Sequence, residues 1–565
     1  MKKLLSGTLI FFSFSLFAQE KSPFSFSLNG SIQSDILFPQ EDKAINAETY
    51  DEFARTNTYA DLNLTSHYLD AGVRFEYLKY PLPGFEPDFA GWGLPHFYAT
   101  GKYRNVKLTV GDFYDQFGSG LIFRTYEERS LGIDNSLRGV RLAYEPYEGI
   151  HLKVLGGQQR RYWERNEGHV LGSDLELNID RWIQKLEETN TFLTLGGSFV
   201  SKNEPDEVIT TDATHRLNLP ANVGAYDIRA RLQKGAYAFL VEYAEKANDP
   251  SKDNKYIYKK GNALLISGSY AQSGLSALLQ AKRSDNMSFR SNRSQLLNSS
   301  FINHLPAFTT QQTYTLAALY PYATQPDGEW AFQGTFSYNF KRNTWIGGKY
   351  GTTIKLNASH IRNIDKKYVE GCDPSNSLSL RGKEGYTSSF FKLGEELYYQ
   401  DINLNIDKKL TKDFKLNLMY MNQQYNPQIV RNEPENIITS NIFIVEGKYN
   451  INKKMTLRAE AQYLHASEYT GPEDVNGLLR VNQGDWLCGV IELSVLPYLM
   501  FTLSDMYNSG ITDMHYYRAL VSYTWEAHFI QFGYGRTRAG RDCSGGVCRD
   551  VPASRGFTLS YNYNF

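Results

Sequence analysis

The sequence predicts an all-β fold, a single large transmembrane antiparallel β-barrel of about 24–26 strands, with an even strand number. Three observations predict it. The chain of 565 residues is polar on average yet rich in aromatic side chains, with 40 Tyr and 33 Phe. Apolar and polar residues alternate along most of its length, and the chain ends on such an alternating run. Barrel strands, which face lipid on one side and water on the other, produce this combination.

The first residues have the pattern of a secretory signal peptide. Lys2 and Lys3 precede the apolar run from Leu4 to Phe17, and Ala18 follows this run. The apolar run is shorter than the ~20 residues of a membrane-spanning helix. We therefore expect a cleaved signal peptide over residues 1–18 and a barrel with long extracellular loops over residues 19–565.

The alternation is clearest in the second half of the chain. Residues 455–463 place Met, Leu, Ala, Ala and Tyr on one face of a strand and Thr, Arg, Glu and Gln on the other. Successive strand residues point to opposite faces, so this strand has an apolar face and a charged face. A secreted β-sandwich also alternates, but charges in the middle of many strands and the absence of a predicted helical layer favour the barrel. Long polar loops are predicted at residues 357–386, 425–437 and 467–485.

The last strand gives the predicted assembly signal. Phe557, Leu559, Tyr561, Tyr563 and Phe565 form one face of it, and the polar residues between them form the other. A terminal strand that ends on Phe resembles the signal that the barrel-assembly machinery reads. The expected partners are thus outer-membrane lipid and this machinery, with an envelope protein as a further partner.

A barrel this wide is not expected to be empty, because transporters of about 22 strands already have a plugged lumen. The candidate fillers are three long irregular segments, 202–223, 283–306 and 357–386. Counting strand directions back from Phe565 places the second of them at the periplasmic end, where a short turn is expected. Either this segment folds into the lumen or the strand count is wrong by one. The first strand is expected near Phe24, which leaves no room before it for the globular plug domain of TonB-dependent transporters.

The four cysteines and the charge restrict the chemistry. Cys543 and Cys548 are separated by Ser-Gly-Gly-Val, and a local disulfide in the loop before the last strand is favoured over a metal site. Cys372 and Cys488 are expected to be thiols, with a long-range bridge as the alternative.

The net charge and the motifs exclude other functions. A net charge of −1 gives no basis for nucleic-acid binding. The ten histidines form no HExxH motif, and the sequence has no GxSxG motif or P-loop, so we expect no catalytic residues, metal or cofactor.

Some stretches are similar to a known family. These are residues 111–121 with 136–142, residues 483–486, and residues 543–549 with 551–553. They resemble a family of uncharacterised Bacteroidota outer-membrane proteins, a domain-of-unknown-function family. The resemblance implies an envelope location and a barrel, but no activity.

Two functions fit these expectations. The first is a channel or substrate-translocating pore without a TonB-type plug domain, because the inward strand faces carry charges of both signs, such as Arg74, Glu76, Arg458, Glu460 and Arg518. The second is a structural or assembly partner of another envelope protein complex. Loops folded into the lumen would favour the second function.

Overall fold

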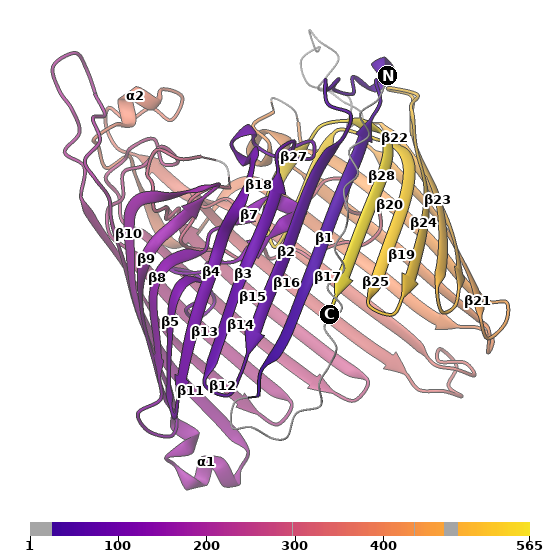
Figure 1. Ribbon diagram of the computed structural model, residues 1–565, viewed down its shortest axis with the longest axis horizontal. Coiled ribbons are helices and arrows are strands. Elements are labelled where there is room, and N and C mark those ends of the chain that lie inside the picture. The colour runs from indigo at the N-terminus through magenta and orange to yellow at the C-terminus, as the bar shows by residue number, and fades with distance from the viewer. Residues whose placement is uncertain (1–24, 297, 434–435, 468–483) are drawn as a thin grey trace.

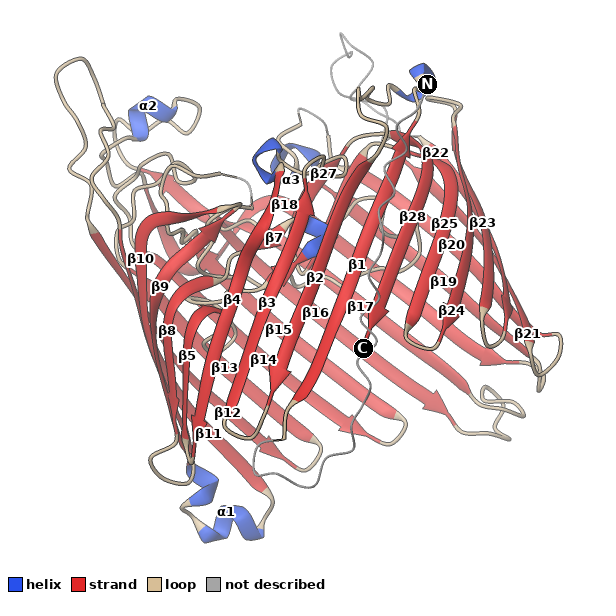
Figure 2. Cartoon of the chain, in the orientation of Figure 1, coloured by secondary structure: helices blue, strands red, loops and turns tan. Residues whose placement is uncertain are grey.

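The computed structural model describes residues 25–296, 298–433, 436–467 and 484–565, so the predicted signal peptide lies outside the described residues. Twenty-four strands form one sheet, in which every strand is antiparallel to its neighbours. The ring closes where the first strand pairs with the last, from Ser31 opposite Asn564 to Pro39 opposite Gly556. The predicted barrel is confirmed, with a strand count at the lower end of the expected range (Figures 1 and 2).

The barrel strands follow one another around the ring in chain order. They are β1 (Ser27–Pro39), β2 (Arg55–Thr65), β3 (Leu69–Leu78), β4 (Gly91–Tyr103), β5 (Val106–Phe113), β8 (Leu137–Tyr144), β9 (Ile150–Arg161), β10 (Glu164–Asn178), β11 (Thr191–Asn203), β12 (Asn222–Lys234), β13 (Tyr237–Lys246), β14 (Gly261–Gln272), β15 (Leu275–Asp285), β16 (Gly328–Phe340), β17 (Thr352–Tyr368), β18 (Tyr386–Lys409), β19 (Phe414–Tyr425), β20 (Ile438–Asn450), β21 (Met455–Ala466), β22 (Asp485–Val495), β23 (Leu499–Ser509), β24 (His515–Trp525), β25 (His528–Thr537) and β28 (Ser554–Asn564).

The remaining elements are short and lie in the connections. They are the strand pairs β6 (Glu127–Glu128) with β7 (Ile133–Asp134) and β26 (Gly540–Ser544) with β27 (Val547–Val551), the 3₁₀ turns η1 (Lys43–Ile45), η2 (Pro87–Phe89), η3 (Arg129–Leu131) and η4 (Ile179–Arg181), and the helices α1 (Gln184–Glu188), α2 (Ser377–Leu380) and α3 (Pro427–Val430). Of the described residues, no helix is long and apolar enough to cross a membrane.

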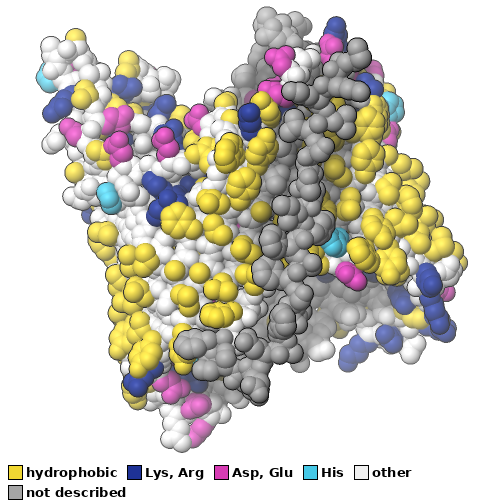
Figure 3. Space-filling model, in the orientation of Figure 1, with side chains coloured by type: hydrophobic (Ala, Val, Ile, Leu, Met, Phe, Trp, Pro, Cys, Tyr) yellow, Lys and Arg dark blue, Asp and Glu magenta, His cyan; other side chains and the backbone are white. Residues whose placement is uncertain are grey.

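The outer face of the wall is apolar. Along β10, Leu171 and Leu175 are 58% and 40% exposed, whereas Val170 and Asp174 on the other face are buried. Figure 3 shows hydrophobic side chains gathered over the visible part of the wall, and we call this apolar outer surface the outer belt. The terminal residues Phe557, Leu559, Tyr561 and Tyr563 belong to the same outer face, since they pair with Phe38, Ile36, Ser34 and Ile32 of β1. This alternation matches the period-two pattern of the sequence.

The connections differ between the two ends of the barrel. Because neighbouring strands are antiparallel, successive connections alternate between the ends. Turns as short as residues 104–105 and 235–236 lie at one end, which we call the short-turn end. The other end, the long-loop end, carries the 286–327 and 538–553 connections.

Two expectations about the loops are wrong. The segment predicted over 283–306 belongs to the long-loop end, because the sequence-based strand count was off by one; Arg283–Asp285 complete β15 and the irregular stretch runs to residue 327. The segment predicted over 357–386 is a shorter loop than expected, because the long strand β17 includes residues 357–368 and β18 begins at Tyr386, so that only residues 369–385 connect them. In Figure 2 this connection, with α2, stands above the ring rather than inside it.

Candidate functional site: a lumen closed by two inner segments

Two connections from the long-loop end fold into the barrel. The first inner segment, residues 114–136, joins β5 to β8 and contains β6, η3 and β7. The second inner segment, residues 286–327, joins β15 to β16. Their apolar side chains and those of the inward strand faces form one core within the ring. The barrel therefore has an interior core in addition to its apolar outer belt.

The first inner segment reaches across the lumen. Arg129 Nη1 donates to Gln33 Oε1 on β1 at 3.2 Å, and the Ser119 amide donates to Glu242 Oε2 on β13 at 3.0 Å. Close to the Ser119 contact in the chain, Phe117, Leu121, Ile122 and Phe123 are completely buried. Four large apolar side chains buried in this way hold the segment in place, since burying each stabilises by ~1.5–3 kcal/mol.

Buried ion pairs fix the same segment to the wall. Both guanidinium Nη atoms of Arg160 on β9 bind Glu76 on β3, at 2.9 and 2.6 Å, and Nη1 also binds Asp134 of the segment at 2.6 Å. Arg74 on β3 binds Glu127 of the segment at 2.8 Å. Burial raises the pKa of Asp134, but Arg160 and Arg74 outweigh this and hold its pKa well below the usual range. The network thus pairs acidic residues of the segment with arginines of the wall, so that most of these buried charges have a partner of opposite sign.

The second inner segment also crosses the lumen. Gln159 on β9 donates to the carbonyl oxygen of Phe301 at 2.6 Å, and the Leu316 amide donates to Gln462 Oε1 on β21 at 2.8 Å. These two strands lie on opposite sides of the ring. The segment returns to its starting point, because the Met287 amide donates to the carbonyl oxygen of Pro326 at 3.0 Å.

The two inner segments bind each other through backbone groups. The Arg124 amide donates to the Ile302 carbonyl oxygen at 2.7 Å, and the His304 amide donates to the Gly120 carbonyl oxygen at 2.9 Å. Asn303 Nδ2 donates to the Leu121 carbonyl oxygen at 3.0 Å. The segments therefore form one body inside the barrel at the long-loop end.

A disulfide hairpin, residues 540–551 with strands β26 and β27, contacts this body from the mouth. Cys543 and Cys548 are paired across the hairpin and form a disulfide, and Cys372 and Cys488 are free cysteines. The hairpin tip is Gly545–Gly546, both with positive φ. A Cβ on Gly546 would lie 2.5 Å from Thr324 Oγ1 and 2.7 Å from Ala307 Cβ, so only glycine allows this close approach.

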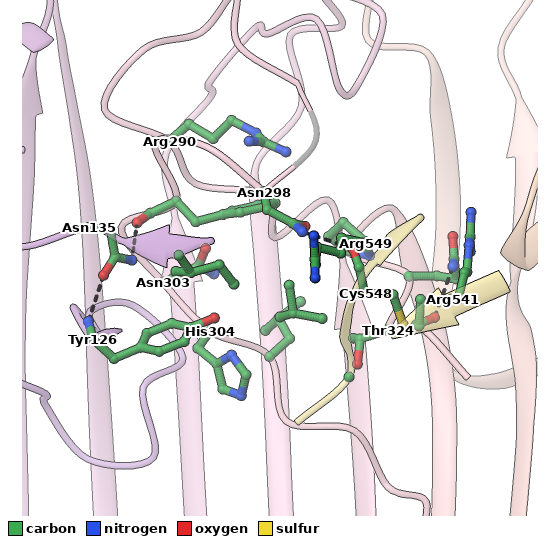
Figure 4. Close-up of a pocket in the computed structure, with 18 of the residues that line it drawn as sticks. Tyr126, Asn135, Arg290, Asn298, Asn303, His304, Thr324, Arg541, Cys548 and Arg549 are labelled. Atoms are coloured by element: carbon green, nitrogen blue, oxygen red, sulfur yellow. Dashed lines mark hydrogen bonds between the residues drawn. The ribbon is translucent and has the colours of Figure 1, made fainter. Parts of the chain in front are cut away.

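A cavity of about 500 Å³ lies where the hairpin meets the inner segments (Figure 4). It is lined by both inner segments, the hairpin and the β3–β4 loop. Its polar lining is Glu86, Tyr126, Asn135, Arg290, Asn298, Asn303, His304, Thr324, Gln325, Arg541, Arg549 and Asp550. A second cavity of about 930 Å³ lies beside it and shares Glu86, Arg541 and Asp550. The first cavity is within the size range of sites for small organic molecules.

Burial controls the charge of two groups in this lining. It lowers the pKa of His304 to about 3, and the nearby cations Arg124 and Lys282 add to the effect, so the imidazole is neutral at pH 7. Burial also raises the pKa of Glu86, and the carboxylate of Asp88 adds to this. Tyr162 donates a hydrogen bond to Glu86.

Sequence reasoning found part of this site. It selected the cysteine pair and the start of the second inner segment, but it missed residues 307–327 and the whole first inner segment. The one indication of the first inner segment in the sequence was the lack of regular alternation of apolar and polar residues around residues 118–135. The other candidate filler, 202–223, is at the mouth: its connection, residues 204–221, packs through Leu217 and Leu219 against Tyr256 of another mouth loop. Within the described ranges, no cluster of His, Cys, Asp and Glu has the arrangement of a metal site.

Comparisons with known proteins give a family and a fold. The family model described as "Family of unknown function (DUF6029)" matches residues 1–565. Similar solved structures include the siderophore receptor PirA from Pseudomonas aeruginosa, with 10% identity, 95% of this chain and 80% of that chain covered, and a TM-score of 0.38. They also include the P pilus usher (PapC) translocation pore (10%, 96% and 99%, TM-score 0.37) and OccAB3 from Acinetobacter baumannii (9%, 96% and 99%, TM-score 0.33). No curated sequence is significantly similar to the chain.

Proposed function

Because the chain belongs to DUF6029, a family of unknown function, we propose its role from its own geometry: a substrate-translocating barrel of the outer membrane, closed at rest by its two inner segments. We propose no enzymatic role. The apolar outer belt and the predicted signal peptide support the outer-membrane location. In this proposal the elements that close the lumen are loops of the barrel itself.

The observation that carries the proposal is the division of the lumen. At the long-loop end the inner segments are packed into an apolar core. Toward the short-turn end the inward faces carry partly exposed charges of both signs, such as Arg458 with Glu446 and Glu492. Arg141 and Lys153 are also partly exposed there, and both bind the buried Asp115 of the first inner segment. A polar conduit below a closure made of loops is the arrangement expected of a gated route for a polar solute.

The test is the conductance of the purified barrel in planar bilayers. The ends of the second inner segment lie side by side, so a short Gly-Ser linker in place of residues 288–325 should leave β15 and β16 in register. We expect small currents from the parent and a several-fold increase from this variant, because a ring of this size is wider than open porins of ~16–18 strands.

A matched control removes a loop that stands outside the lumen. The Val369 amide donates to the Gly385 carbonyl oxygen at 3.1 Å, so residues 370–384 can be replaced by the same linker. This variant should conduct like the parent. If the 288–325 variant inserts and keeps its heat-modifiable form but conducts no better than the parent, the translocation proposal is wrong.

A structural or assembly role is the second candidate, and the buried anchoring of the inner segments favours it. Arg160 binds Glu76 and Asp134, and Lys282 on β15 binds Glu329 on β16 at 2.7 Å and the Pro306 carbonyl oxygen of the second inner segment at 2.5 Å. Such anchors suit a closure that never opens. Absence of any conductance in both the parent and the 288–325 variant would support this second candidate.

A further inference from the structure

We infer that the cavity between the disulfide hairpin and the inner segments binds an organic anion, a carboxylate or another oxyanion with an apolar body, and that Arg549 holds its charged group. The inference deepens the proposed function and rests on it in one respect, because the bound anion would be the solute that the barrel carries.

Among the described residues, Arg549 is the cation of the lining that forms no ion pair. Its Nη1 donates to the Pro83 carbonyl oxygen at 3.2 Å and its guanidinium lies 4.3 Å from the Phe85 ring centroid. Across the described ranges, no carboxylate lies within ion-pair distance of it, and its buried Nε has no hydrogen-bond partner. Burial lowers the pKa of Arg549, and Asp542, which lies opposite it in the hairpin, offsets only part of this effect. The guanidinium is still charged at pH 7.

The other two arginines of the lining are already neutralised. Arg290 Nε binds Asp253 at 2.6 Å, and its guanidinium lies 3.6 Å from the Phe301 ring centroid. Arg541 Nε binds Asp550 at 2.8 Å, and its Nη1 donates to the Val430 carbonyl oxygen. The positive charge available to a ligand is therefore concentrated at Arg549. Figure 4 shows its side chain between β27 and Asn298.

The acidic groups of the lining oppose an anion only weakly. The Asp550 side chain is 75% exposed and shares its charge with Arg541. Glu86 accepts a hydrogen bond from Tyr162 and has a raised pKa, so it carries less negative charge than an ordinary glutamate at mildly acidic pH. His304 is neutral. Thr324, whose buried Oγ1 has no hydrogen-bond partner, offers a hydroxyl donor on the same lining.

The apolar part of the lining selects an organic anion over a bare inorganic one. Ile133, Met287 and Leu305 are buried residues of the two inner segments, and Val547 belongs to the hairpin. An apolar body against these side chains gains hydrophobic free energy, which an inorganic ion does not. Charge-assisted hydrogen bonds to the guanidinium would fix the orientation of the ligand.

The test is equilibrium dialysis of the purified, folded barrel with three probes: naphthalene-2-carboxylate, its uncharged carboxamide, and inorganic phosphate, each corrected for uptake by empty micelles. We expect the parent to bind the carboxylate most tightly. Arg549→Gln should weaken this binding by about tenfold or more, as expected for the loss of a hydrogen bond to a charged group. Arg549→Lys, which keeps the charge, should retain most of it.

The matched control is Arg104→Gln, which removes an exposed arginine from a turn at the opposite end of the barrel. It should bind like the parent, and all variants should show the same heat-modifiable form. Equal binding of the carboxylate and the carboxamide, or equal binding by the parent and Arg549→Gln, would overturn the inference. Phosphate binding as tight as that of the carboxylate would overturn the organic-anion assignment. Arg549-dependent binding by a barrel that never conducts would support the binding site and contradict the translocation role.

Discussion

Asn298 Nδ2 donates a hydrogen bond to the carbonyl oxygen of Cys548 at 2.8 Å, although the two residues are 250 positions apart in the sequence. A second bond, from the Thr324 amide to the Gly546 carbonyl oxygen at 3.0 Å, joins the same two elements. The disulfide hairpin therefore binds the second inner segment at two places, Asn298 and Thr324. The closure can open at this place only if the hairpin and the segment separate.

Replacing both Cys543 and Cys548 by Ser should loosen the closure. In the chain-entropy model, a disulfide that closes so short a loop contributes about 2 kcal/mol to the stability of the structure it holds. We expect faster amide exchange in residues 298–308 and larger bilayer currents than in the parent. Mass spectrometry of non-reduced peptides should first show the parent pair oxidised.

The control for this experiment is Cys372→Ser, which removes a free thiol from a connection outside the lumen. It should leave exchange and current unchanged. Two free thiols at Cys543 and Cys548 in the purified parent, or unchanged exchange in the double variant, would contradict the role of the hairpin.

Arg160→Met should release the first inner segment from the wall. The substitution keeps the bulk of the side chain but leaves Glu76 and Asp134 without their main counter-charge. Removing one partner of a buried ion pair costs ~3–5 kcal/mol. We expect protease cleavage and amide exchange within residues 114–136 to increase.

Lys102→Met is the matched control, because it breaks the partly exposed pair with Asp70 at 2.7 Å. Partly exposed pairs contribute ~0–1 kcal/mol, so this variant should resemble the parent. Equal protection of residues 114–136 in both variants would show that the Arg160 network does not anchor the segment.

Acid should weaken the closure through His304. Its pKa is about 3 in the folded protein and ~6.5 in an unfolded chain. Between these values the unfolded segment binds a proton that the folded segment does not, so stability falls as the pH is lowered through this range and is fully present above pH ~6.5. Amide exchange of residues 298–308, corrected for intrinsic rates, should be faster at pH 4.5 than at pH 7.5.

His304→Gln isolates this effect from the carboxylates that titrate in the same range. The hydrogen bond from the residue 304 amide to the Gly120 carbonyl oxygen does not involve the side chain, so the substitution leaves it in place. The variant should show a smaller change between the two pH values. The same change in parent and variant would assign the acid response to other groups.

The wall of the barrel could be predicted from the sequence because the face on which a strand residue lies depends only on its position relative to its neighbours in the chain. That Ala461 faces outward and Glu460 inward follows from the alternation along residues 455–463, and the paired cysteines are neighbours in the chain. The outer belt repeats this relation in strand after strand. Because the alternation has a fixed period of two residues, the prediction of a barrel does not depend on placing each strand end correctly.

The interior could not be predicted in the same way, because its contacts join distant parts of the chain. Nothing in residues 118–123 indicates that they pack beside Ile302, and Arg549 is a cavity residue only because Pro83 and Asn298 lie beside the hairpin. One miscounted strand also moved the second inner segment to the wrong end. Irregular segments have no period that would specify their partners.

Deleting Phe565 should impair assembly more than it impairs the folded barrel. The Phe565 amide donates to the Gly30 carbonyl oxygen at 3.0 Å, and the Gly30 amide donates to a Phe565 carbonyl oxygen at 2.9 Å, so this residue extends the ladder that closes the ring. Its ring also covers Gly30, where an added Cβ would lie 2.6 Å from it. Loss of two among the many hydrogen bonds of the β1–β28 seam costs ~1–3 kcal/mol, too little to unfold a closed barrel. We therefore expect a lower yield of heat-modifiable barrel in cells, but a similar denaturant midpoint for the protein that does assemble.

Deletion of Trp345, which is 95% exposed in the β16–β17 connection, serves as the control. Equal cellular yields of the two deletions would show that the terminal aromatic residue is not an assembly signal.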